Sequence, residues 1–320
     1  MQNIKLTRRW PHEVEQALSE IGHLHINESD EPMSREELAM ALAENDVVCP
    51  TVTDRLDAEL LQSGDVRTKL LANFGVGFNH IDIEAAREAG IKVSNTPGVL
   101  TDATAEIALT LLLTSARRTG EGERHVRSGA WVGWRPTHML STQVTGKTLG
   151  IVGMGRIGTA LARKAHHGLN MRILYCNRSP IPESVAVETG AERVALEELL
   201  GRSDFVSLNC PATPETRHLM NADTLSQMQS HAHLINTARG DVVDEHALVE
   251  ALEKGVIASA GLDVYEGEPT LADGLISLEN VVLLPHMGSG TSETRIAMGR
   301  CAMDNVSAFL QGRPIPNEVC

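Results

Sequence analysis

Three glycines between a strand pattern and a helix pattern constrain the fold of this chain more than any other feature. The apolar run Leu149–Val152 is followed at once by GMGRIG, whose glycines are Gly153, Gly155 and Gly158, and a helical pattern comes next. In this context the first glycine permits a tight turn, the second lets the backbone approach a pyrophosphate, and the third allows close packing of helix on strand. The N–H groups and dipole at a helix N-terminus favour an anion. The segment therefore predicts a parallel α/β domain that binds a dinucleotide.

Strand and helix patterns alternate through most of the chain. A first series runs from residue 12 to about 98 and a second from Thr148 onward, and we expect one long apolar helix at Thr101–Arg118 between them. Such alternation is typical of βαβ units in a parallel sheet, and 320 residues suffice for two domains. We predict an α/β fold of two Rossmann-like, doubly wound parallel-sheet domains with a cleft between them. The seam is expected near residues 95–100.

The formal net charge of −14 limits the classes of partner. An acidic surface disfavours binding to nucleic acid and to anionic membranes. The longest aliphatic run, Ile107–Thr114, is far too short to cross a bilayer, and the N-terminal residues lack the apolar stretch of a signal peptide. We therefore expect neither a nucleic-acid nor a membrane partner. An anionic substrate would have to be captured by local positive groups, because the overall field repels it.

The five cysteines are scattered without a CxxC pair, and no histidine cluster has metal-ligand spacing. An odd and dispersed set of cysteines favours reduced thiols over a disulfide framework. We therefore expect a cytoplasmic protein without a metal site.

The strand after the glycine-rich segment ends at Asn177-Arg178-Ser179, and Asn177 lies 19 residues after Gly158. An NAD-selective site has a carboxylate near this position, where it binds the ribose 2′-OH. This chain has a neutral side chain beside an arginine, and Arg178 can pair bidentately with a 2′-phosphate, which a carboxylate would repel. The pattern predicts that NADPH is preferred over NADH. The alternative is that Arg178 is a solvated surface charge.

Three chemically active side chains follow strands of the second series. Arg239 comes after the strand that ends near Thr237, Glu268 directly precedes Pro269, and His286 lies in the segment LPHMG. In open parallel sheets, ligands bind at the carboxyl ends of the strands. We therefore expect these three side chains to meet at one site.

This set matches the needs of a reaction that reduces a 2-keto acid. Arg239 can fork onto the carboxylate and carbonyl of the substrate and polarise the carbonyl group. His286 can donate a proton in reduction and accept one in oxidation, and a hydrogen bond to Glu268 would favour its charged form. Each residue has a structural alternative: a surface arginine, a loop carboxylate, and one buried histidine among thirteen. Their joint placement favours catalysis.

Six segments carry a resemblance to a known family. They are Asn73–Asp82 (NFGVGFNHID), Asn95-Thr-Pro97, Gly153–Gly158, Thr237–Val243 (TARGDVV), Gly261–Pro269 and Leu284–Gly288. Their order and spacing resemble those of the D-isomer-specific 2-hydroxyacid dehydrogenases over nearly the whole chain. Within that family the chain is most similar to the glyoxylate/hydroxypyruvate reductases, because of Gly133-Trp134-Arg-Pro136 and the Asn177-Arg178 pair.

The resemblance implies an enzyme that transfers a hydride from NADPH, or from NADH, to a small 2-keto acid and forms the D-2-hydroxy acid. It assigns Arg239, Glu268 and His286 as the catalytic set. Family members contact the cofactor at positions that correspond here to Thr104, Gly153, Gly155, Arg156, Ile157, Gly158, Asn177, Arg178, Ser179, Cys210, Pro211, Thr216, Thr237, Ala238, Asp263, His286 and Gly288.

The resemblance also implies how the chain is organised and how it holds its substrate. Residues 1–98 with 288–320 would form a discontinuous, flavodoxin-like substrate-binding domain, and residues 99–287 the dinucleotide-binding Rossmann domain. The substrate would meet Arg239 and the backbone N–H groups of Val76 and Gly77. Family members usually pair as homodimers through the cofactor domain. In the reductase subgroup, a tryptophan like Trp134 reaches the substrate site of the neighbouring subunit.

Three other functions compete with this interpretation. A D-3-phosphoglycerate-type dehydrogenase would need additional Lys or Arg side chains for the phosphate, and the sequence has no obvious cluster of this kind. Formate dehydrogenase is disfavoured because Glu268 stands where those enzymes carry a glutamine. A non-catalytic, corepressor-like scaffold keeps the same fold and catalytic set, so that turnover of a keto acid is needed to separate it from an enzyme. The compact length and the absence of a long disordered tail disfavour the scaffold.

Overall fold

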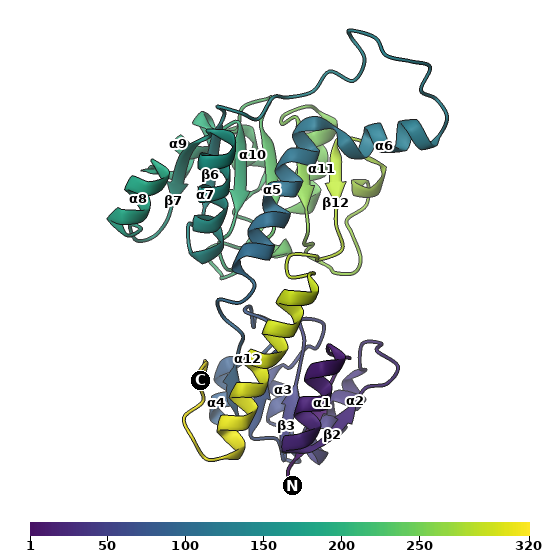
Figure 1. The fold of residues 1–320 in the computed structure, drawn as a ribbon, viewed down its shortest axis with the longest axis vertical. Helices are drawn as coiled ribbons and strands as arrows, with labels where there is room; N and C mark the ends of the chain where they lie inside the picture. Colours follow the sequence, from purple (N-terminus) through teal and green to yellow (C-terminus); the bar gives the residue numbers. More distant parts are fainter. The chain divides into compact units, whose positions relative to one another are not determined.

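The computed structural model describes residues 1–320, and the chain divides into two compact units (Figure 1). Unit 1 comprises Met1–Leu100 and Gly290–Cys320, whereas unit 2 is the continuous segment Thr101–Ser289. Each unit has one parallel sheet with helices, which confirms the predicted fold class.

Unit 1 is built from the first and last parts of the chain. Its elements are β1 (Asn3–Leu6), α1 (His12–Ile21), β2 (His23–Ile26), α2 (Arg35–Glu44), β3 (Val47–Cys49), α3 (Ala58–Leu61), β4 (Leu70–Ala72), α4 (Ile83–Glu88), β5 (Lys92–Ser94) and α12 (Ser292–Leu310). The strand order is β2-β1-β3-β4-β5. Strands β3 and β4 are buried at every residue because apolar clusters cover both faces of the sheet. β1 lies before residue 12, where the predicted alternation begins, and was missed by the sequence analysis.

Unit 2 contains the glycine-rich segment and a seven-stranded sheet. Its elements are α5 (Thr101–Arg117), α6 (Thr119–Arg127), β6 (Thr148–Val152), α7 (Arg156–Leu169), β7 (Arg172–Cys176), α8 (Glu183–Thr189), β8 (Glu192–Arg193), α9 (Leu196–Arg202), β9 (Phe205–Leu208), α10 (Ala222–Ser226), β10 (His233–Asn236), η1 (Gly240–Val242), α11 (Glu245–Glu253), β11 (Ser259–Leu262), η2 (Leu275–Ser277) and β12 (Val281–Leu283). The strand order is β12-β11-β10-β9-β6-β7-β8. From β6 the chain adds β7 and β8 on one side and then crosses to β9 on the other. This reversal creates a topological switch point at β6, where ligands of such sheets bind.

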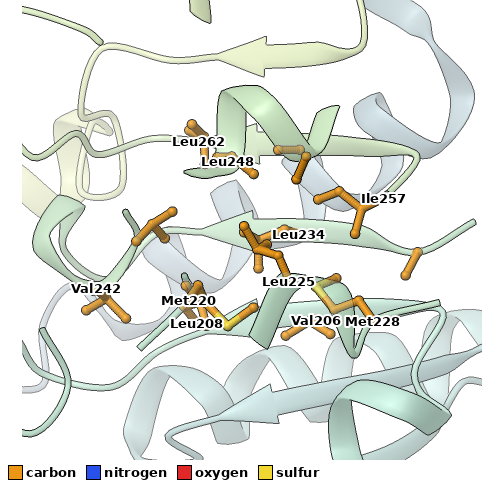
Figure 2. Close-up of a cluster of buried hydrophobic side chains, with 14 of the residues drawn as sticks. Val206, Leu208, Met220, Leu225, Met228, Leu234, Val242, Leu248, Ile257 and Leu262 are labelled. Carbon is orange, nitrogen blue, oxygen red and sulfur yellow. The ribbon is translucent and has the colours of Figure 1, made fainter. Parts of the chain in front are cut away.

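Apolar side chains cover both faces of the unit 2 sheet. Figure 2 shows one of these clusters, in which Val206 of β9 and Leu234 of β10 pack with Leu248 of α11. On the opposite face, Leu111 of α5 and Leu161 of α7 are fully buried in a second cluster. The helices thus bury the aliphatic strands on both sides and leave the strand ends as the place where polar side chains can gather.

A long segment, residues 118–147, interrupts unit 2 between α5 and β6, and we call it the arm. The helix expected at Thr101–Arg118 ends at Arg117, because Arg118 takes a left-handed backbone conformation with φ of 52°. Helix α6 follows and buries none of its side chains, and the next strand begins only at Thr148. In Figure 1 this arm extends away from the sheet of unit 2. None of the helices, in the arm or elsewhere, combines the length and the apolar character that a membrane crossing requires.

Candidate active site

The glycine-rich segment forms a tight loop between β6 and α7. Gly153 has a φ of +91°, and a Cβ at this position would lie 2.6 Å from the backbone N of Cys210. A Cβ on Gly158 would lie 2.8 Å from the carbonyl oxygen of Gly153, so that a side chain there would separate helix from strand. At Gly155 the space is open within 4 Å. The first and third glycines are thus required for packing, and the second leaves the backbone accessible.

The surroundings of this loop fit a dinucleotide. Gly155 is the N-cap residue of α7, and no side chain caps the helix, so its first N–H groups stay available to an anion. Two buried polar atoms at the carboxyl ends of neighbouring strands, Oγ1 of Thr237 and Oδ1 of Asn209, have no hydrogen-bond partner within the chain. Buried polar groups are almost always paired in a functional state, so these atoms are natural contacts for a bound molecule.

The end of β7 has contacts that the sequence pattern did not indicate. The side chain of Asn177 turns back onto the glycine loop: its Oδ1 accepts from the N–H of Met154 (2.6 Å), and its Nδ2 donates to the carbonyl of the same residue (3.2 Å). Arg178 and Ser179 are exposed. The guanidinium of Arg193 donates to the carbonyl oxygens of Asn177 (3.0 Å) and Arg178 (2.9 Å). Asn177, the residue near the position where an NAD-selective site has a carboxylate, therefore braces the loop, and Arg178 and Arg193 lie beside it.

Glu268 and His286 form a hydrogen-bonded pair. Nδ1–H of His286 donates to Oε2 of Glu268 at 2.8 Å, and the two side chains are 32% and 33% exposed. Burial alone would raise the pKa of Glu268, but the hydrogen bond and charge of His286, with smaller contributions from Tyr265 and Arg239, lower it below its usual range. His286 has a φ of 55°, an unusual conformation for a residue with a side chain and one that often marks a functional site.

The carboxylate of Asp263 fixes the loop that carries His286. Its two carboxylate oxygens accept from the N–H groups of Met287 (2.6 Å) and Gly288 (2.7 Å). Burial raises the pKa of Asp263, although these bonds and the charge of His286 oppose the shift. Thr104 of α5 donates from Oγ1 to the carbonyl of Gly288 at 3.0 Å. Three predicted cofactor contacts, Asp263, Gly288 and Thr104, are therefore also the residues that orient the histidine loop.

Arg239 lies at the end of β10, just before the 3-10 turn η1, and is partly buried. One of its N–H groups donates to the carbonyl of Ala238 at 2.6 Å. Burial lowers the pKa of Arg239, whereas the negative charges of Glu268 and Asp241 raise it. Because Glu268 and Arg239 act on each other's charge, the arginine belongs to the same electrostatic environment as the Glu268–His286 pair.

Close backbone packing joins the arginine loop to the glutamate loop. A Cβ on Gly240 would lie only 1.9 Å from the carbonyl carbon of Tyr265, so no residue with a side chain fits there. The hydroxyl of Tyr265 donates to the carbonyl of Leu284 at 2.8 Å and thereby links the end of β11 to the segment that leads to His286. Three loops that carry the predicted catalytic side chains are thus held together at one edge of the sheet.

The other predicted cofactor residues of unit 2 lie at the same edge. Thr216 Oγ1 donates to the carbonyl of Pro211 at 2.7 Å and closes the turn after β9. Cys210 is buried against Gly153, and Ala238 is buried next to Arg239. The remaining positions, Arg156 and Ile157, form the first turn of α7.

In unit 1, a second glycine loop follows β4. Asn73 is fully buried, and its Nδ2 donates to the carbonyls of Gly75 (3.1 Å) and Gly77 (3.0 Å). Asn95 donates to the carbonyl of Val76 at 2.9 Å. All three carbonyls of the loop are thus bonded inward, while the N–H groups of Val76 and Gly77 donate no hydrogen bond within the chain. The loop can therefore present two N–H donors to an anion.

Trp134 lies in the arm and is 81% exposed. The side chains of Val126, Trp131, Val132 and Leu140, also in the arm, are more than half exposed. The structure therefore leaves Trp134 largely in solvent within the single chain that it describes.

Two residues that shape this site were not predicted from the sequence. Arg193 supports the backbone beside Arg178, and the buried Glu245 bonds to the loop that contains Glu268. Glu245 lies two residues beyond the family-like segment Thr237–Val243, and nothing in the local pattern marks it, because its partners are backbone N–H groups more than twenty residues away. Nothing in the sequence pattern marks Arg193, because its partners are backbone carbonyls.

Comparisons with known proteins agree with this arrangement. The family model described as "D-isomer specific 2-hydroxyacid dehydrogenase, NAD binding domain" matches residues 109–288. A protein called glyoxylate reductase from Thermococcus litoralis is 45% identical over 318 residues, which cover 98% of this chain and 95% of that protein.

Solved structures give the same result. A structure described as a putative D-isomer specific 2-hydroxyacid dehydrogenase from Polaromonas is 38% identical, with a TM-score of 0.93 and full coverage of both chains. An NADPH-dependent glyoxylate/hydroxypyruvate reductase from Sinorhizobium meliloti, in complex with NADP and malonate, is 33% identical with a TM-score of 0.87, covering 100% of this chain and 97% of that one. With the glycine loop, the Glu268–His286 pair and Arg239 at one sheet edge, these matches show that the chain belongs to the D-isomer specific 2-hydroxyacid dehydrogenase family and is an NAD(P)-dependent dehydrogenase.

Proposed function

We propose that the enzyme reduces small 2-keto acids of the glyoxylate and hydroxypyruvate type to the corresponding D-2-hydroxy acids, with NADPH as the preferred reductant. The observation that carries the proposal is the hydrogen-bonded Glu268–His286 pair beside Arg239, at the edge of the sheet where the glycine loop lies. The relatives named glyoxylate reductase support the choice of substrate class.

The protein groups have separate roles in this reaction. Arg239 binds the substrate carboxylate and carbonyl through its two-pronged guanidinium and fixes the orientation of the carbonyl carbon. The bound cofactor supplies the hydride that this carbon accepts. Because Nδ1 of His286 is bonded to Glu268, Nε2 is the ring atom that faces the reacting oxygen and gives it a proton. The negative charge of Glu268 stabilises the imidazolium before the transfer, and solvent restores the proton afterwards.

In unit 1, the proposed role of Val76 and Gly77 is to bind the substrate carboxylate through their N–H groups. The inward bonding of the three loop carbonyls supports this role, because only donors face outward. We accordingly propose the parts assigned by the resemblance, with residues 1–98 and 288–320 binding substrate and residues 99–287 binding the dinucleotide.

The preference for NADPH rests on the absence of a carboxylate at the end of β7 and on Arg178 and Arg193. The name of the Sinorhizobium relative, which is called NADPH-dependent, supports it. Binding of 2′,5′-ADP and 5′-AMP to the free enzyme tests it without turnover. We expect 2′,5′-ADP to bind at least about tenfold more tightly, and Arg178→Ala to abolish the difference, since a charge-assisted bidentate pair contributes about 1.5–3 kcal/mol. Equal affinities in the unmodified enzyme would contradict the proposal.

The exposed apolar side chains of the arm support a homodimer formed through unit 2. Several large apolar side chains exposed in one segment are typical of a protein interface. We propose that Trp134 completes the substrate site of the neighbouring subunit. Light scattering after size-exclusion chromatography tests the dimer. For Trp134→Ala we expect the ratio of kcat/KM between glyoxylate and hydroxypyruvate to change, and an unaltered ratio in a dimeric variant would refute that role.

One panel of initial rates tests the function as a whole. It uses glyoxylate, hydroxypyruvate, pyruvate and 2-ketogluconate, each with NADPH and with NADH. We expect the highest kcat/KM for glyoxylate or hydroxypyruvate with NADPH. Negligible turnover of all four acids by a folded enzyme that binds the cofactor would instead support a scaffold.

A further inference from the structure

The loop that carries Glu268 is held at both of its ends by one buried carboxylate. Oε1 of Glu245 accepts from the N–H of Glu266 at 2.7 Å, and Oε2 accepts from the N–H of Ala272 at 3.2 Å. These two hydrogen bonds join both ends of the segment 266–272 to Glu245, and Glu268 is one of the residues of this loop. The side chain of Glu266 is also hydrogen-bonded, to Arg217 (2.7 Å) and His218 (3.0 Å), but Glu245 is the side chain that bonds to the backbone of both ends.

The position of Glu245 suits this role. It is the first residue of α11 and only 5% exposed. A carboxylate in the first turn of a helix is stabilised by the helix dipole, and its two hydrogen bonds to N–H groups compensate for burial of its charge. Asp244, the preceding residue, already caps the helix by accepting from the N–H of Ala247 at 3.0 Å. The carboxylate of Glu245 is therefore not needed as the cap and is free to hold the loop.

The held loop determines where the oxygens of Glu268 lie. Oε1 of Glu268 accepts from the N–H of Tyr265 at 2.9 Å, which leaves Oε2 for His286 at 2.8 Å. On its other side, the Tyr265–Glu266 backbone is pressed against Gly240, next to Arg239. A displacement of the Glu266 end would therefore change the Glu268–His286 distance and the contact with the arginine loop together.

We propose that Glu245 is a positioning residue for the acid–base pair: by fixing both ends of the loop, it keeps Oε2 of Glu268 on Nδ1 of His286. This inference rests on the roles proposed above for Glu268 and His286. Glu245 does not touch the substrate or the cofactor. Its effect is transmitted through the Glu266–Ala272 backbone, and its loss acts on proton transfer and not on cofactor affinity.

The test compares Glu245→Ala and Glu245→Gln with the unmodified enzyme. For each we would measure kcat, KM for glyoxylate, the pH profile of kcat/KM, NADPH affinity by fluorescence, and Tm. Glu245→Ala should lower kcat about 10–100-fold, because a shift of about 1 Å at a catalytic group can cost as much as 10² in rate. The alkaline limb of kcat/KM should move to lower pH, since the displaced carboxylate no longer accepts the Nδ1–H hydrogen bond of the proton donor. KM and NADPH affinity should change less than about threefold.

Glu245→Gln keeps the shape of the side chain and one acceptor oxygen. It should show the same decrease in kcat, here about 3–10-fold, and a smaller move of the alkaline limb. If the alanine variant does not fold, Glu245→Gln alone tests the proposal. Glu250→Gln is the matched control, because Glu250 is an exposed carboxylate on the same helix that accepts a hydrogen bond from Lys254. It should leave kcat and the pH profile unchanged.

Two further outcomes are distinguishable. If Glu245→Ala and Glu245→Gln lower Tm but keep kcat and the alkaline limb of the unmodified enzyme, Glu245 only stabilises the fold and the inference is overturned. Glu268→Gln serves as the reference for the underlying proposal. If Glu268→Gln itself retains the activity and pH profile, the proposed function of the pair fails, and the role of Glu245 fails with it.

Discussion

The two ends of the unit 2 sheet contain similar residues in opposite environments. At the amino end, His233 begins β10 and is 3% exposed, stacked on Phe205 with ring centroids 4.9 Å apart. Its Nδ1 is hydrogen-bonded to Ser259 at 3.0 Å. At the carboxyl end, His286 is bonded to Glu268 and is about one third exposed.

The contrast extends to the charges. Burial lowers the pKa of His233 to about 4, with a smaller contribution in the same direction from His231, while Asp204 opposes the shift. His233 is therefore neutral near pH 7. At the other end the charge of His286 helps to lower the pKa of Glu268, which therefore stays ionised. A histidine near a carboxylate is thus not by itself evidence of a catalytic pair. The exposure of the histidine and the strand end at which it lies indicate whether it can act on a substrate.

The largest expected effect separates the two histidines by activity. His286→Asn should lower kcat/KM for glyoxylate about 10²–10⁴-fold, because it removes the general acid. The control is His231→Asn at the amino end, where His231 is bonded to Asp204 and is 48% exposed. Steady-state kinetics of both variants should show a change of less than about twofold for the control. Comparable losses in the two variants would remove the distinction between the sheet ends.

A second prediction concerns the shape of the positive group. Arg239→Lys keeps a positive charge but loses the two-pronged donor, and we expect kcat/KM for glyoxylate to fall about 100-fold. Arg202→Lys is the control, because Arg202 is an exposed arginine of α9 that pairs with Glu192 and Glu198. Full activity of Arg239→Lys would show that charge alone suffices and would contradict bidentate binding.

The third prediction tests the amino end by stability. In the pH range between about 6.5 and 4, the unfolded chain binds a proton at residue 233 and the folded chain does not. The free energy of unfolding should therefore decrease as the pH falls through this range, by about 1.4 kcal/mol per pH unit and by about 3 kcal/mol in all. His233→Gln should lack this part of the slope. Urea denaturation at several pH values compares the two proteins, and equal slopes would show that His233 takes up its proton readily when folded.

The smallest expected effect is that of Ser259→Ala. The change removes the partner of Nδ1 of His233 in a buried site, and it should lower the free energy of unfolding by about 1–2 kcal/mol. The value of kcat should stay the same, because Ser259 lies at the amino end of β11. A loss of activity in a stable variant would show that the two ends of the sheet are coupled.

The sequence patterns predicted most of the cofactor unit because its signals are local. The glycine loop and the strand on either side of it depend on residues that follow one another in the chain, and the family motifs added the catalytic set. The predictions were weaker where structure depends on distant partners. Strand β1 has only four residues, of which Ile4 and Leu6 are buried, and it is recognisable only beside β2 and β3.

The site shows the same limit. Asn177 was predicted to contact the cofactor, but the hydrogen bonds of its amide to Met154, a residue 23 positions away that the turn brings back, were not predicted. The partners of Glu245 lie 21 and 27 positions further along the chain. Such contacts are set by the packing of loops against one another, which periodicity and local motifs do not describe. The burial of Glu245 likewise depends on how the loop folds over it, so it could not be predicted from the sequence pattern.

The discontinuity of unit 1 has a consequence for the order of events during synthesis. The apolar surface of α1 and β1 is completed by α12: Met298, Ala302 and Val306 share one buried cluster with Ile4 and Val14. A ribosome delivers the whole of unit 2 before it delivers these residues. The apolar surface of α1 and β1 therefore stays uncovered while unit 2 is synthesised, a period in which chaperones have their greatest opportunity to bind.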